Sequence, residues 1–105
     1  MKSDFYMADL LNNKQALITA IEAALAGDWE TSHNIIQVYS DTDSNNKIAN
    51  WIHAVLHKIE GDESNSKYWY ARTNINGKTK FFDTYGDGFA ELVEISDHLY
   101  YPDEA

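Results

Sequence analysis

The chain has 105 residues, enough for one domain with a single core. Apolar residues make up 44% of it, so it can bury enough surface to fold, and the lack of cysteine removes disulfides, thiolate metal sites and cysteine nucleophiles. A net charge of -9 argues against nucleic acid and anionic membranes as partners, which leaves protein segments, cations and small ligands.

The N-terminal residues include Asp4 and Asp9 and have no apolar run of signal-peptide length. No window reaches the roughly 18 to 20 apolar residues that a membrane span needs. We therefore expect a cytoplasmic protein that makes no membrane contact.

The first two helices are expected over residues 13–26 and 28–40. Residues 13–26 carry apolar side chains at helical spacing in an alanine-rich background, and Gly27 follows where a C-terminal cap belongs. A short helix can precede them from Ser3 onwards, with Asn12 and Asn13 as an interruption. Asp28 is the expected N-cap of the second helix.

The third helix is expected over residues 44–60, with apolar side chains at i, i+4, i+7, i+8 and i+11: Ile48, Ile52, Val55, Leu56 and Ile59. Gly61 ends it, and Asp62 or Ser64 can cap a fourth helix that runs to about Arg72.

Beyond residue 73 the pattern is weaker. Residues 74–86 contain Asn76-Gly77, a favourable hairpin turn, so a small hairpin or a loop folded over the helices is expected there. A closing helix over residues 88–98 would use Phe89, Leu92, Val93 and Ile95 as its apolar side.

An internal repeat links the two halves of this helical region. The dipeptide Gly27-Asp28 recurs as Gly61-Asp62, 34 residues later, and apolar or small residues match at the same offset. The segments "GDWETSHNIIQVY" and "GDESNSKYWYART" resemble the second-helix half of the tetratricopeptide repeat, although Ser32 and Ser66 stand where that family prefers alanine. The resemblance implies two stacked helical hairpins, over about 13–40 and 44–73.

The second unit has a narrower resemblance. Its core has the pattern W-x-H-A-x-L-H-x-x-E-G-D followed by Y-W-Y-x-R, which is similar to a small, functionally uncharacterised, mostly bacterial helical family. The similarity covers roughly residues 25 to 73 and includes a counterpart of His33. It implies an all-helical fold and carries no known activity.

The third helix also brings polar residues together. His53, His57 and Glu60 fall within about 60° of one another on a helical wheel, well away from the apolar stripe. Histidines at i and i+4 can bind a zinc-like ion, with Glu60 or with His33 from the neighbouring helix as a third ligand. Ala54 stands where the zincin motif has its catalytic glutamate, which disfavours metalloprotease chemistry.

Two other interpretations compete with the metal site. The same residues can form a hydrogen-bonded polar layer between helices or stay solvated. Alternatively, they can contribute to a binding groove for a peptide or a small ligand, in which arginine would bind a carboxylate in bidentate fashion. The residues expected on that surface are Asn50, His53, His57, Tyr68, Tyr70 and Arg72.

The sequence thus predicts an all-α single domain, residues 1–105, made of two stacked helical hairpins and a C-terminal helix. The favoured function is a non-catalytic binding module that needs no cofactor and recognises a protein segment or a small ligand. The alternative is a metal-binding protein or metal-dependent enzyme that uses His33, His53, His57 and Glu60. A structural subunit of a larger assembly and a homodimer formed through the apolar end helices also fit the pattern.

Overall fold

The computed structural model describes residues 2–42, 46–73, 82 and 88–100, with side chains for 14–39, 46–73, 82, 88–97 and 99. It contains α1 (Lys2–Leu25), α2 (Trp29–Thr42), α3 (Lys47–Glu60), α4 (Glu63–Tyr70) and α5 (Phe89–Tyr100). No strand occurs in these described segments, so the all-α prediction is confirmed.

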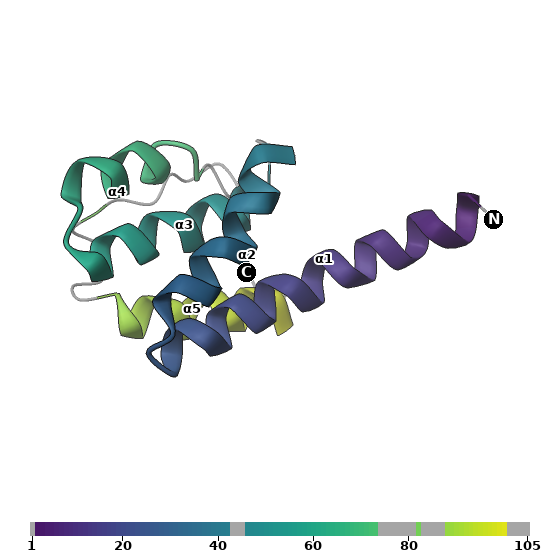
Figure 1. The fold of residues 1–105 in the computed structure, drawn as a ribbon, viewed down its shortest axis with the longest axis horizontal. Coiled ribbons are helices and arrows are strands. Elements are labelled where there is room, and N and C mark those ends of the chain that lie inside the picture. The colour runs from purple at the N-terminus through teal and green to yellow at the C-terminus, as the bar shows by residue number, and fades with distance from the viewer. Residues whose placement is uncertain (1, 43–45, 74–81, 83–87, 101–105) are drawn as a thin grey trace.

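The helices form two hairpins and a closing helix (Figure 1). α1 packs with α2, α3 packs with α4, and α2 packs against α3, so that the two hairpins stack. α5 lies against both α1 and α3, the first helices of the two hairpins. The N-terminal half of α1 projects beyond this body.

Several helix boundaries differ from the sequence-based expectation. α1 continues through Asn12 and Asn13, so no separate N-terminal helix forms. α3 begins at Lys47 and not at residue 44, because Asn46 is its N-cap and accepts a 3.0 Å hydrogen bond from the Ala49 amide. α2 extends two residues past residue 40, α4 ends two residues before residue 72, and α5 runs two residues past residue 98.

The two Gly-Asp turns have the same hydrogen bonds, 34 residues apart. Gly27 and Gly61 have φ values of +88° and +91°, a region that glycine enters without steric cost. The amide of Asp28 donates to the Ala23 carbonyl at 2.8 Å, and that of Asp62 donates to the His57 carbonyl at 2.9 Å. The repeat in the sequence is therefore a repeat of the turn geometry.

α3 is the central helix of the body. It contacts α1, α2, α4 and α5, and all nine residues from 49 to 57 are buried. The sequence pattern places only one side of α3 against the core, the side that carries Ile48, Ile52, Val55, Leu56 and Ile59. Because helices surround α3, Trp51 is fully buried and the polar side of the helix is enclosed as well.

α5 closes the fold against α3. Gly88, with φ of +101°, precedes it, and a Cβ atom there would lie 3.0 Å from Ile59 Cγ1. Leu92 and Ile95 are buried, whereas Phe89 and Val93 are exposed, which corrects their expected place on the apolar side. The hairpin or loop expected over residues 74–86 lies outside the described residues except for Phe82, which packs against the core.

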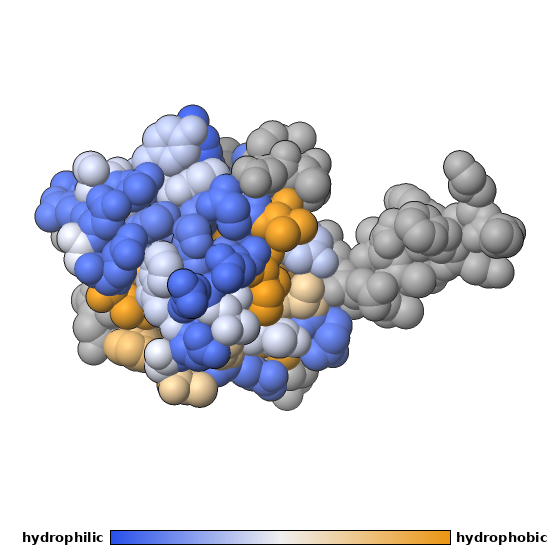
Figure 2. All heavy atoms as spheres, in the orientation of Figure 1, coloured by the Kyte–Doolittle hydropathy of each residue, from blue (hydrophilic) through white to orange (hydrophobic). Residues whose placement is uncertain are grey.

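Figure 2 shows that hydrophilic residues cover most of the face on which α2, α3 and α4 lie, and that hydrophobic residues are restricted to smaller areas. This distribution agrees with the acidic composition of the chain.

Candidate functional site

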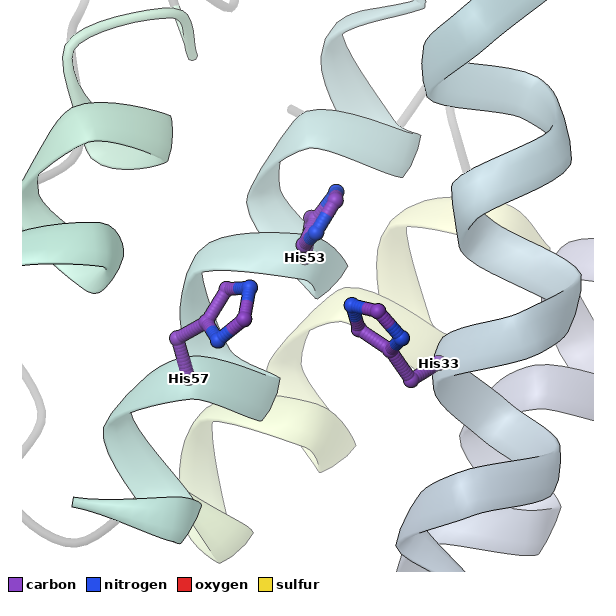
Figure 3. Close-up of side chains that lie close together, drawn as sticks. All are labelled: His33, His53 and His57. Carbon is purple, nitrogen blue, oxygen red and sulfur yellow. The ribbon is translucent and has the colours of Figure 1, made fainter. Parts of the chain in front are cut away.

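Three histidines meet at the seam between the two hairpins. His53 and His57 lie one turn apart on α3, and His33 faces them from α2 (Figure 3). The i, i+4 spacing places the first two on the same face of α3 because a helix has 3.6 residues per turn. Packing of α2 against α3 then brings in the third ring.

The three imidazole rings are close enough to contact one ion together. One ligand nitrogen from each of His33, His53 and His57 lies within 4.8 Å of the other two. The ring centroids are 4.9 Å apart for His53 and His57, 5.0 Å for His33 and His53, and 5.3 Å for His33 and His57. Figure 3 shows nitrogens of His33 and His57 pointing into the space between the rings.

Aromatic residues orient two of the three imidazoles. Trp29 stacks on His33 with 4.6 Å between centroids, and Trp69 stacks on His53 at 4.0 Å. The Trp29 indole nitrogen donates a 2.6 Å hydrogen bond to the Leu56 carbonyl of α3, which ties α2 to α3 beside the cluster. These contacts limit ring rotation before any ligand arrives.

Glu60 orients the third imidazole. One of its carboxylate oxygens lies 2.6 Å from Nδ1 of His57. A carboxylate at this nitrogen favours the tautomer in which Nδ1 carries the proton and Nε2 has the free lone pair. Since Nδ1 and Nε2 point to opposite sides of the ring, Glu60 stands behind His57. This contact suits a carboxylate that orients a ligating histidine, and the expected place of Glu60 among the metal ligands stays a prediction.

The cluster is enclosed unevenly. His53 and His57 are 1% and 7% exposed, whereas His33 is only half-buried. Burial, with the neighbouring His57 and His33, lowers the pKa of His53 to about 3. Burial and His57 also lower the pKa of His33, against a smaller opposing effect of Glu60. Both rings are therefore neutral near pH 7, the form in which imidazole binds metal ions.

The residues expected to line a binding groove are mostly enclosed. Asn50, His53, His57 and Tyr70 are all buried, so they do not lie on an open surface. Only Tyr68 and Arg72 are exposed, and the guanidinium carbon of Arg72 lies 3.7 Å from the centre of the Tyr68 ring. The structure thus separates an exposed Tyr-Arg pair from the enclosed histidines.

A buried carboxylate that the sequence analysis missed holds α5 in place. Glu91 is fully buried and accepts hydrogen bonds from Trp51 Nε1 at 2.6 Å and from the Tyr70 hydroxyl at 2.6 and 2.7 Å. Lys58 Nζ lies 2.8 Å from the same carboxylate. The sequence contained one signal for the burial of Glu91: it precedes the apolar Ile95 by four residues, which places both on the same side of α5.

Comparisons with protein-family models, with curated proteins and with solved structures found no match to this chain. Among the helices that the structure describes, none combines the length and the apolar character needed to cross a membrane.

Proposed function

We propose that this protein binds a transition-metal ion through His33, His53 and His57. The observation that carries the proposal is the convergence of three imidazole nitrogens within 4.8 Å, from two helices. Nitrogens that share a tetrahedral zinc ion at about 2.0–2.1 Å are about 3.4 Å apart, so small ring movements would complete the site.

The ligand type selects the class of ion. Imidazole suits zinc, copper, nickel and cobalt ions, whereas magnesium and calcium prefer oxygen ligands. The three nitrogens carry no charge of their own when neutral, and Glu60 places one negative charge next to His57. That charge would compensate part of the charge of a divalent ion and make His57 a stronger donor.

This proposal reverses the order of the two functions that the sequence suggested. A groove requires its polar groups along an open surface, but four of the six expected groove residues are buried. A metal site requires converging nitrogens, each held by a second contact, and here Trp29, Trp69 and Glu60 supply these contacts. We also expect the two stacked hairpins to be tetratricopeptide-like. In addition, we expect a cytoplasmic location and a protein partner.

Calorimetric titration of the chelator-treated protein with zinc tests the proposal. We expect about one ion per chain, with affinity lost in His33→Gln and His53→Gln variants. His33 is the more informative position because it is half-buried and its replacement disturbs packing least. Glu63→Gln is the matched control, because it removes an exposed carboxylate on α4 that forms an ion pair with Lys67. Absence of zinc, copper, nickel and cobalt binding to the folded protein would reject the proposal.

A further inference from the structure

The three histidines provide three ligands, and the described residues offer no fourth histidine or carboxylate within 4.8 Å of all three. Two carboxylates, those of Glu60 and Asp62, form a separate group with His57. Glu60 is bonded to the His57 nitrogen that points away from the cluster, so it cannot join the same ion without giving up that bond.

Of the three histidines in the cluster, His33 is the most exposed. His53 and His57 are enclosed, but His33 is half-buried and so are the two indoles that flank the cluster, Trp29 and Trp69. A ligand that reaches the ion from solvent would therefore arrive next to His33, beside the Trp29 indole. Such an approach suits a small ligand and not a peptide.

From these two observations we propose that an ion held by His33, His53 and His57 keeps one coordination position for an exchangeable ligand, a water molecule that a small monovalent anion displaces. This inference rests on the proposed metal binding and goes beyond it. Structural zinc sites are closed by four protein ligands, whereas three protein ligands and one water are typical of sites where zinc acts on small molecules. The inference therefore assigns the site to the second type.

The charge of the site supports an anionic ligand. Three neutral imidazoles leave a divalent ion with its full charge, and among the described residues the carboxylate in contact with one of these rings is that of Glu60. An anion in the fourth position lowers the net charge of the enclosed centre, which is favourable where little solvent can screen it. Azide is a suitable probe because it is small, monovalent and a good ligand for cobalt and zinc.

The test uses the full chain loaded with one equivalent of Co²⁺, whose visible absorption reports the ligands around the ion. We expect absorption bands of a four-coordinate ion, and we expect them to shift in a saturable way when azide is added. In a Glu63→Gln control the same shift should appear at the same azide concentration.

The outcomes separate the two proposals. If the four-coordinate bands form and azide does not change them, a fourth protein ligand closes the site; the exchangeable position is then rejected while metal binding stands. If no bands form and calorimetry shows no binding of Co²⁺ or Zn²⁺, both proposals fail. A shift that also occurs in His33→Gln, with unchanged azide dependence, would place the ion elsewhere and overturn the inference.

Discussion

The Nδ1 atom of His57 and a carboxylate oxygen of Glu60 lie 2.6 Å apart, on successive turns of α3. This contact fixes which His57 nitrogen faces the cluster formed with His33 and His53. It also gives Glu60 a role that replacement by glutamine can isolate, because glutamine keeps the size of the side chain and removes its charge.

Glu60→Gln should weaken zinc binding by about 10- to 100-fold, the usual cost of losing a carboxylate behind a ligating histidine. Calorimetric titration measures the effect, and the number of ions per chain should not change. Glu63→Gln, which removes an exposed carboxylate from α4, should leave the affinity as it is. Equal zinc affinities for Glu60→Gln and the native protein would show that Glu60 does not support the site.

Acid should destabilise the metal-free protein through the histidine cluster. Burial, then His57 and His33, lower the pKa of His53 from 6.5 to about 3, so the unfolded chain binds a proton that the folded chain excludes. This effect is absent above pH 6.5, where the ring is neutral in both states. As the pH falls from 6.5 towards 3, the free energy of unfolding decreases by about 1 kcal/mol per pH unit. Glu60 is a further charged group beside the cluster, in contact with His57.

Urea unfolding at a series of pH values measures this slope. A His53→Gln variant has no such proton to exclude, so its free energy of unfolding should fall less steeply between pH 6.5 and 4. Parallel pH profiles for the variant and the native protein would contradict the assignment of the effect to His53.

Breaking the Lys58–Glu91 ion pair by replacing one partner should destabilise the fold far more than breaking the Lys67–Glu63 pair in the same way. The side chains of Lys58 and Glu91 are 5% and 0% exposed, whereas those of Lys67 and Glu63 are 56% and 60% exposed. Glu91→Gln leaves Lys58 without a buried counter-charge, which costs about 3–5 kcal/mol. Lys67→Met removes an exposed pair and should cost about 0.5 kcal/mol or less.

Free energies of unfolding from urea titrations test this contrast. Adding Lys58→Met to Glu91→Gln should recover part of the loss, since no buried charge is then left unpaired. A Glu91→Gln protein with native stability would show that the carboxylate does not anchor α5.

The repeated serines offer a matched pair with opposite expected effects. Ser66 Oγ donates a 2.7 Å hydrogen bond to the Ala54 carbonyl, whereas the equally buried Ser32 Oγ has no hydrogen-bond partner among the described residues. Ser66→Ala should therefore lower the free energy of unfolding by about 1 kcal/mol, and Ser32→Ala should leave it unchanged or raise it by a similar amount. Identical effects of the two substitutions in urea unfolding would contradict this.

Residue spacing alone predicts much of the candidate site. His53 and His57 share a face of α3 because they are four residues apart, and His33 was a candidate because the second helix had to neighbour the third. Residue spacing does not predict the burial of these histidines, because their burial requires α1, α2, α4 and α5 to surround α3. For the same reason the groove expected from Asn50 and Tyr70 could not be excluded beforehand.

The sequence by itself determined the helices, the two Gly-Asp turns and their 34-residue period. These depend on local factors: the spacing of apolar side chains, the left-handed conformation at Gly27 and Gly61, and the capping side chains of Asp28 and Asp62. Only the tertiary structure decided what happens between elements far apart in the chain. It placed Glu91 against Trp51 and His33 against His53, because burial and hydrogen-bond geometry depend on how whole helices pack and not on the period of any one of them.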